Sequence, residues 1–174
     1  DAVEEADEKT IFILSSPPNA HYSQIKLLLN FHKNIFIEKP IFVHPLEVNL
    51  IEKDLTNKNI IVAEMLMYKF TKQYKKFIRF WDKKKNRCNR IECFFNIPEI
   101  AFNTFRNNDE ITSSSLYDIG SYLFSLLVDL KIYPSNLEII KVIKRKKRFL
   151  KFIIRGSTDK IDIYLEFGFE NKYY

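Results

Sequence analysis

The chain has 174 residues, of which 46% are hydrophobic and 15% aromatic, so it can bury a core as one domain or as parts of two, and disorder is disfavoured. The formal net charge of +6 permits acidic partners such as nucleotides, nucleotide-sugars or nucleic acid without choosing among them. The two cysteines, and the lack of any long uncharged apolar run, argue against a disulfide framework, a metal site, a signal peptide and a membrane span. They favour a soluble protein of the reducing cytoplasm.

The first 40 residues predict a strand, a helix and a second strand. Ile11–Leu14 is a short apolar run closed by serines and prolines, which is typical of a strand buried on both faces of a parallel sheet. Apolar residues recur at helical spacing between His21 and Phe31, and Ile35–Ile37 is a second apolar run. Strand, helix and strand in this order predict a βαβ unit with a right-handed crossover.

The residues that follow these two strands are candidates for a site, because open α/β sheets bind ligands at the carboxyl ends of their strands. Ser16 and Pro17 follow the first strand, and Glu38, Lys39 and Pro40 follow the second. The strand ends therefore carry a serine–proline turn together with an adjacent carboxylate and ammonium.

The sequence does not contain the glycine-rich turn of a dinucleotide-binding domain. A Rossmann dinucleotide-binding domain normally opens with a strand and a G-x-G-x-x-G turn, which holds the pyrophosphate at a helix N-terminus. Gly120, Gly156 and Gly168 are the only glycines, and they do not have that spacing.

Beyond Pro40 the alternation continues, with a helix predicted over 45–55, a strand over 60–67 and a basic helix over 69–81. Residues 83–87 are rich in lysine and are predicted to form a solvated loop, with phosphate binding as the alternative.

The rest of the chain predicts a second kind of sheet. Charged residues on the outer faces of its short strands predict an open antiparallel or mixed sheet with one face covered. The strands are expected at 90–97, 136–144, 148–155 and 160–169. Residues 113–130, which begin with three serines able to cap a helix and continue as a leucine-rich stripe, predict a helix between them.

Two motifs in this arrangement resemble the Gfo/Idh/MocA family, the glucose-fructose oxidoreductase and inositol dehydrogenase type of nicotinamide-dependent sugar oxidoreductase. In that family one strand ends in Thr/Ser-Pro, a His follows four residues after the Pro, and the next strand ends in Glu-Lys-Pro. Those places are held by Ser16-Pro17, His21 and Glu38-Lys39-Pro40. The family's Asp-x-Gly-x-Tyr/His motif is matched by Asp118-Ile119-Gly120-Ser121-Tyr122.

The sequence departs from the family pattern in two places. Thr112-Ser113-Ser114-Ser115 stands where the family has glycines before the second motif, and Lys69 stands where it has an arginine. The first change can shift the loop, and the second keeps the charge but loses the planar fork of a guanidinium.

The resemblance implies a fold of the α/β class in two parts. Residues 1–68 would be the C-terminal part of a Rossmann dinucleotide-binding domain, with a parallel sheet, starting just before its fourth strand. Residues 69–174 would form an incomplete α+β domain for substrate binding and oligomerisation, with an open, mainly antiparallel sheet. The first dinucleotide half would be missing.

The resemblance also implies an enzyme. It would use NAD or NADP to move hydride between the nicotinamide and a hydroxyl or keto carbon of a sugar, nucleotide-sugar or cyclitol. It would form a homo-oligomer through the open sheet, without a nucleic acid, metal or membrane partner. As given, the chain is expected to bind NAD(P) weakly or not at all.

The chemistry of hydride transfer suggests the catalytic residues. Tyr122 is expected to transfer the hydroxyl proton, and the Lys39 ammonium to lower the pKa of that tyrosine from its reference value near ~10. Asp118 lies four residues before Tyr122, on the same helix face, and is expected to orient the sugar together with Arg106.

The cofactor contacts are expected from the strand ends, namely from Ser16, Pro17, Glu38 and Lys39. Glu38 would hold Lys39 or accept a cofactor hydrogen bond. No catalytic role is expected for His21.

Two other interpretations remain open. Lys141–Arg148 is basic enough to bind nucleic-acid phosphates, with Phe149 and Phe152 available for stacking, although a sheet strand with a solvated basic face is the preferred interpretation. Alternatively, the chain is a non-catalytic relative that keeps the sheet as an assembly surface, which the missing glycine loop supports.

Overall fold

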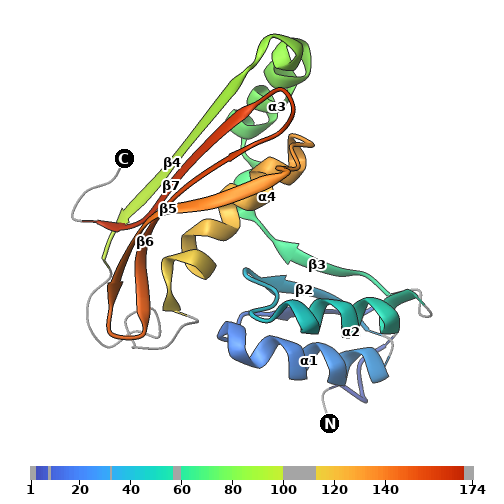
Figure 1. Cartoon of the computed structure of the whole chain (residues 1–174). Coiled ribbons are helices and arrows are strands. Elements are labelled where there is room, and N and C mark those ends of the chain that lie inside the picture. Colours follow the sequence, from blue (N-terminus) through green and yellow to red (C-terminus); the bar gives the residue numbers. More distant parts are fainter. Residues whose placement is uncertain (1–2, 8, 32, 57–59, 100–112, 171–174) are drawn as a thin grey trace. The chain divides into compact units, whose positions relative to one another are not determined.

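The computed structural model describes residues 3–7, 9–31, 33–56, 60–99 and 113–170. The chain divides into two compact units, Asp1–Leu66 and Met67–Tyr174, two residues from the boundary predicted at residue 68. The first unit holds a parallel sheet with helices and the second a mixed sheet with helices, which confirms the predicted fold class (Figure 1).

The first unit contains a three-stranded parallel sheet. Its strands are β1 (Ile11–Leu14), β2 (Asn34–Glu38) and β3 (Val62–Met65), in that spatial order, with Ile13 opposite Phe36 and Phe36 opposite Ala63. The connections are α1 (Pro18–Asn30) and α2 (Pro45–Thr56). Helix α1 begins directly after Pro17, and Pro18 suits its first turn because proline lacks an N–H that would need a partner.

The described helices of the first unit cover one face of this sheet, and Ile11 and Ile13 are more than half exposed, so the prediction that Ile11–Leu14 is buried on both faces is wrong. Helices α1 and α2 contact each other and lie on the same face (Figure 1). Two right-handed crossovers that move the same way along a sheet place both helices on one side. Ile35 and Ile37 are therefore buried against the helices, whereas Ile13 on the other face is 67% exposed.

The second unit opens with helices. A 3₁₀ turn, η1 (Met67–Phe70), leads into α3 (Lys72–Lys84), and a second short turn, η2 (Lys85–Arg87), follows it. Thr71 fixes the start of α3 because its side chain accepts a hydrogen bond from the Tyr74 N–H. The lysine-rich segment 83–87 is exposed as predicted, but it is helical rather than a loop, since lysines are favourable at a helix C-terminus.

The sheet of the second unit has the spatial order β4-β7-β6-β5. Its strands are β4 (Arg90–Pro98), β5 (Asn136–Arg145), β6 (Arg148–Ser157) and β7 (Asp162–Glu170). Strands β4 and β7 are parallel, and the other neighbours are antiparallel. The sheet is therefore open and mainly antiparallel, as predicted.

One face of this sheet packs against helices to form the core of the unit. The predicted helix over 113–130 is observed as a π-helical turn, η5 (Leu116–Gly120), that continues into α4 (Ser121–Asp129). The buried core residues are Trp81, Ile119, Leu123, Leu127, Leu130, Ile132, Leu150, Phe152, Ile154, Ile163, Leu165, Phe167 and Phe169. Gly120 permits the close packing, because a Cβ there would lie 2.9 Å from Phe167 Cε2.

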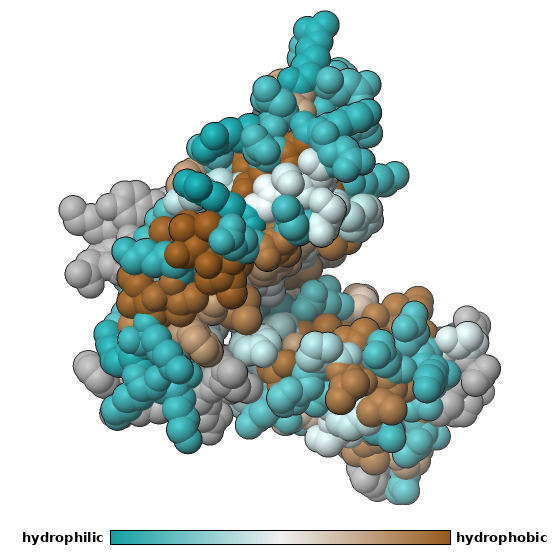
Figure 2. Space-filling model, viewed as in Figure 1, coloured by the Kyte–Doolittle hydropathy of each residue, from teal (hydrophilic) through white to brown (hydrophobic). Residues whose placement is uncertain are grey.

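Strand β5 forms one edge of the sheet, and all ten of its residues are exposed. Figure 2 shows an apolar surface bordered by hydrophilic residues over this part of the unit. The exposed apolar side chains of β5 are Leu137, Ile139, Ile140, Val142 and Ile143.

Candidate active site

The carboxyl ends of β1 and β2 carry the residues that the sequence marked as cofactor contacts. Ser16 and Pro17 lie in the β1–α1 connection, Glu38 ends β2, and Lys39 follows it. Because β1 and β2 are adjacent parallel strands, these residues lie at the same edge of the sheet. Lys39 is a largely buried residue, 9% exposed.

His21 links the two loops at this edge. The side chain is 0% exposed, and its Nε2 lies 2.8 Å from the Ser16 carbonyl oxygen while its Nδ1 lies 3.0 Å from the Pro40 carbonyl oxygen. Both ring nitrogens therefore lie within hydrogen-bond distance of a backbone carbonyl oxygen, one in each loop. One buried side chain of α1 thus holds the loop that carries Lys39 against the loop that carries Ser16.

Two further hydrogen bonds fix these loops. The Ser16 hydroxyl donates to Gln24 Oε1 at 2.6 Å, which ties the first loop to α1. The Ile41 N–H donates to Glu64 Oε1 at 2.9 Å, which ties the second loop to β3. The backbone directly after the cis Lys39–Pro40 peptide is therefore held by side chains of α1 and β3.

In the second unit, the sequence-predicted residues lie on the helix that starts at η5. Asp118 is 8% exposed within η5, and Tyr122 is half-buried near the start of α4. The Tyr122 ring makes edge-to-face contacts with Phe95, at 5.4 Å between ring centroids, and with Tyr68, at 5.8 Å. These contacts fix the direction of the ring between η1 and β4.

A hydrogen-bonded chain supports Tyr122 from η1. The Ser125 hydroxyl donates to the Tyr122 carbonyl oxygen at 2.9 Å, and the Tyr68 hydroxyl lies 2.8 Å from Ser125 Oγ. Since Ser125 has one hydroxyl proton and gives it to the carbonyl, Tyr68 is the donor of the second bond. Tyr68 therefore contacts the Tyr122 ring directly, and it is also linked to the Tyr122 backbone by the two hydrogen bonds of Ser125.

Asp129 completes this network at the C-terminal end of α4. Lys69 Nζ donates to its Oδ1 at 2.9 Å, and the Tyr74 hydroxyl donates to its Oδ2. Burial, reinforced by the hydrogen bond to the Asp129 carboxylate, raises the pKa of Tyr74. Tyr74 therefore stays protonated, and remains a donor, above the pH at which an ordinary tyrosine ionises.

Tyr122 also borders an apolar cavity of about 800 Å³ within the second unit. The cavity is formed by α3, β4 and α4, and its lining includes Tyr68, Phe77, Trp81, Cys93, Phe95, Leu123 and Leu126. Cys88 and Cys93 are free thiols, and burial raises the pKa of Cys93, so that thiol is a poor nucleophile.

The structure thus gathers the predicted residues into two groups. Ser16, Pro17, Glu38 and Lys39 share one edge of the first unit, and Asp118 and Tyr122 share one helix of the second. Arg106 lies outside the described residues. The pairing of Lys39 with Tyr122 joins the two units and stays a prediction.

Sequence reasoning missed three groups that support these residues. His21 was given no chemistry, because its partners are backbone carbonyls that leave no mark on the sequence. Asp129 carried a usable signal, since a carboxylate at a helix C-terminus opposes the macrodipole and calls for a cation such as Lys69. Arg148 could not be told apart from the lysines around it.

Two negative observations apply to the described part of the chain. No three His, Cys, Asp or Glu side chains there lie together as a metal site requires. Among the helices in those ranges, none combines the length and apolar character needed to cross a membrane.

Comparison with known proteins establishes the fold. No family model matches the sequence, and no curated protein matches it. The structure is similar to KijD10, a 3-ketoreductase from Actinomadura kijaniata whose structure holds NADP and TDP-benzene, with 18% identity and a TM-score of 0.80 over 99% of this chain and 54% of that one. It is also similar to an oxidoreductase from Bacillus cereus, with 14% identity and a TM-score of 0.80 over 99% and 50% of the two chains.

A third similar structure is the WlbA (WbpB) dehydrogenase from Thermus thermophilus, in complex with NAD and alpha-ketoglutarate. It shares 13% identity and a TM-score of 0.77 with this chain, over 98% of this chain and 54% of its own. The chain therefore spans about half the length of these structures. At such identities the likeness establishes a shared fold, and membership of the Gfo/Idh/MocA family stays a prediction.

Proposed function

We propose that this chain belongs to an NAD(P)-dependent oxidoreductase that acts on a hydroxyl or keto carbon of a sugar, nucleotide-sugar or cyclitol. One observation carries the proposal: almost the whole chain, in both units, follows the fold of oxidoreductases that hold NAD or NADP. The edge of the first unit and the Tyr122 helix of the second are the parts of that fold where the sequence places its candidate residues.

The residues fit the nicotinamide end of such a cofactor better than its phosphate end. At the edge of the first sheet, a largely buried lysine and a serine are held in place by His21 and Glu64. A glycine-rich phosphate loop is not part of this sequence. When bound, the nicotinamide would accept or donate the hydride.

The chain's own residues would handle the proton and the substrate. Oxidation of an alcohol releases one hydride and one proton, and Tyr122 would take the proton from the hydroxyl, returning it when the reaction runs toward the alcohol. Lys39 would hydrogen-bond the reacting oxygen, and Asp118 and Arg106 would hold the sugar. Ser16, Pro17 and Glu38 would contact the cofactor from the strand ends.

We further propose that copies of the protein associate through the open face of the second sheet. On that face Lys151 forms an ion pair with Glu166 at 2.6 Å, and the half-buried Ile153 lies opposite Glu166. The cytoplasmic location expected from the cysteines is part of the same proposal.

One of the two aromatic side chains in the nucleic-acid interpretation lies in the core of the unit, whereas the other, Phe149, is half-buried. Phe152 is 4% exposed and stacks on Phe167 in the core, with 5.5 Å between ring centroids. Arg145 and Arg148 are both engaged by Glu99, which leaves fewer free cations on this stretch for phosphates.

The experiment is a screen of the intact protein for nicotinamide-dependent turnover. NADH and NADPH are offered with keto-sugars and nucleotide keto-sugars, and NAD and NADP with sugars and cyclitols, while the absorbance of the reduced nicotinamide is followed. We expect turnover with at least one member of these classes. A protein that binds a nicotinamide cofactor but turns over none of them would favour the non-catalytic assembly protein.

A further inference from the structure

A buried arginine directly follows the turn between β5 and β6, where the sequence predicted a solvated basic face. Arg148, the first residue of β6, is 2% exposed. The side chain of Arg145, three residues earlier, is 52% exposed. The two arginines belong to the same basic stretch, but only one of them enters the unit.

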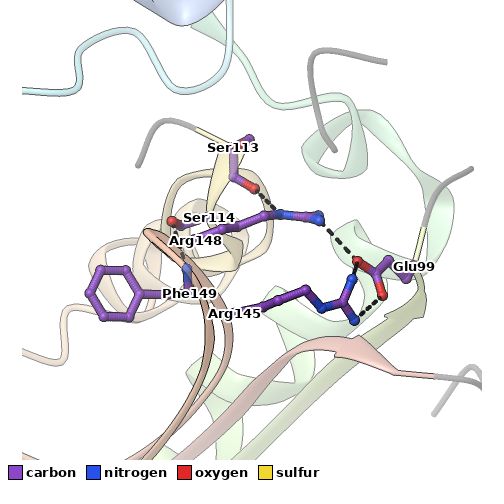
Figure 3. Close-up of polar contacts among 6 residues, drawn as sticks. All are labelled: Glu99, Ser113, Ser114, Arg145, Arg148 and Phe149. Atoms are coloured by element: carbon purple, nitrogen blue, oxygen red, sulfur yellow. Dashed lines mark hydrogen bonds and ion pairs between the residues drawn. The ribbon is translucent and has the colours of Figure 1, made fainter. Parts of the chain in front are cut away.

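Arg148 makes contacts in three directions. Its Nε donates to the Ser113 carbonyl oxygen at 3.0 Å, and its Nη1 donates to Glu99 Oε1 at 3.0 Å (Figure 3). Its guanidinium also lies 4.5 Å from the centre of the Phe169 ring. Arg145 binds the same Glu99 through two hydrogen bonds, at 2.8 and 2.9 Å, whereas the contacts to Ser113 and Phe169 belong to Arg148.

The segment that Arg148 holds is the start of the helix with the candidate residues. Ser113, Ser114 and Ser115 are 2%, 0% and 0% exposed. Ser114 Oγ accepts a hydrogen bond from the Phe149 N–H at 3.0 Å (Figure 3). The first two residues of β6 therefore bind two adjacent serines of the segment. The Ser114 carbonyl oxygen in turn accepts from the Asp118 N–H at 3.1 Å.

Electrostatics add a reason for an arginine at this place. Burial lowers the pKa of Arg148 from its ordinary value, while the carboxylates of Glu99 and Asp118 oppose that shift. A buried cation is tolerated when it is hydrogen-bonded and a carboxylate is near, and Glu99 supplies both to Nη1 of Arg148. The planar fork of a guanidinium can serve Ser113 and Glu99 together, which the single ammonium of a lysine cannot do with the same geometry.

We propose that Arg148 is a positioning residue, which sets the start of the η5–α4 helix and thereby the placement of Asp118 and Tyr122. The catalytic consequence rests on the proposed function, whereas the positioning itself does not.

The first test measures local order in the 174-residue chain. Hydrogen exchange of peptides covering Ser113–Tyr122 is compared between wild type, Arg148→Met, Arg148→Lys and the matched control Arg145→Met. Arg148→Met and Arg148→Lys should each speed exchange in this segment by about tenfold or more, the equilibrium equivalent of losing a hydrogen bond to a charged donor. The control should leave exchange there within about twofold, because Arg145 shares Glu99 but does not reach Ser113.

The second test measures kinetics in the intact enzyme. Arg148→Lys, which keeps the charge, should lower kcat by roughly 10- to 100-fold while the KM for the nicotinamide cofactor stays unchanged, because misplacement of Tyr122 affects the reacting centre and not the cofactor loops. Arg145→Met should leave both constants unchanged.

The two tests separate the two proposals. Equal exchange in the Arg148 and Arg145 variants would overturn the positioning role, even if the enzyme is active. An intact protein without nicotinamide-dependent turnover would overturn the proposed function, and the exchange measurement would still decide the role of Arg148. If Arg148→Met does not fold, Arg148→Lys alone decides it.

Discussion

His21 sets the geometry of two loops with one buried ring. Its contacts to the carbonyl oxygens of Ser16 and Pro40 hold the first and second strand ends of the parallel sheet together. Because the ring is completely buried, water cannot take its place without a rearrangement. Lys39, next to Pro40, owes part of its position to a residue eighteen places earlier in the chain.

We predict that His21→Ala lowers the free energy of unfolding by about 2–4 kcal/mol, because it removes a completely buried ring together with its contacts to two part-buried carbonyl oxygens. Urea unfolding of the chain, followed by circular dichroism, measures the change. The control is Ser23→Ala on the same helix, where an exposed hydroxyl bonds the Ala20 carbonyl oxygen and the cost should stay within about 0.5 kcal/mol. Equal costs for the two variants would show that the ring does not link the loops.

At the scale of single residues, the sequence predicted which side chains lie at the site, but it could not predict their hydrogen-bond partners. The spacing of Ser16-Pro17, His21 and Glu38-Lys39-Pro40 marked the edge of the sheet where those residues lie. The bonds from His21 to carbonyl oxygens depend on how the loops fold back, and backbone acceptors are the same at every residue. The burial of Arg148 could not be predicted for a related reason, since it depends on how the chain turns between β5 and β6 and not on composition.

At the scale of an element, the η5–α4 helix shows how packing overrides local preference. Gly120 lies within it at a normal helical φ of −60°, where alanine would be the better helix former. The glycine is required by the neighbour instead, because the added Cβ would lie 2.9 and 3.1 Å from two atoms of the Phe167 ring, and that ring is 0% exposed.

Gly120→Ala is therefore predicted to destabilise the chain by about 1–3 kcal/mol, with the gain in helix propensity offsetting only part of the overpacking. The control is Ser121→Ala, next along the helix. Among the described residues the buried Ser121 hydroxyl has no hydrogen-bond partner, so its removal should leave stability unchanged or raise it by up to about 1 kcal/mol. Thermal unfolding of both variants checks the pair, and a Gly120→Ala chain as stable as wild type would mean that the Phe167 ring can yield.

The ends of a helix or strand could be predicted where a capping or turn residue marks them in the sequence. Thr71 caps α3 and moves its start three residues past the prediction, and the four residues of β1 were predicted without error. The exposure of Ile11 and Ile13 could not be read from β1 itself. It depends on which face α1 and α2 cover, and that follows from the order of the strands.

At the scale of the whole molecule, the chain has two units and about half the length of the oxidoreductases that share its fold. The sequence predicted the α/β class because strands and helices alternate in the first unit, and it predicted an open sheet because the later strands carry charged outer faces. The placement of one unit against the other is not encoded in any such pattern, so the Lys39–Tyr122 pair could be proposed only from the resemblance.

The absence of a glycine-rich turn from the sequence has a direct consequence for cofactor binding. We expect the 174-residue chain to bind NADH and NADPH with a Kd weaker than about 1 μM, or about −8 kcal/mol, because the helix-terminus site for the pyrophosphate is not in it. Titration calorimetry measures the affinity. Submicromolar binding would mean that other residues of this chain hold the phosphates.

The most direct test of the account is the turnover of a Tyr122→Phe variant of the intact protein, with the substrate found in the nicotinamide screen. The substitution removes the hydroxyl and keeps the ring that packs against Tyr68 and Phe95, so unfolding should be little changed. We predict that kcat falls by roughly 10²–10⁴-fold, the usual contribution of a positioned acid or base. A Tyr122→Phe enzyme with undiminished turnover would contradict the account and remove Tyr122 from the reaction.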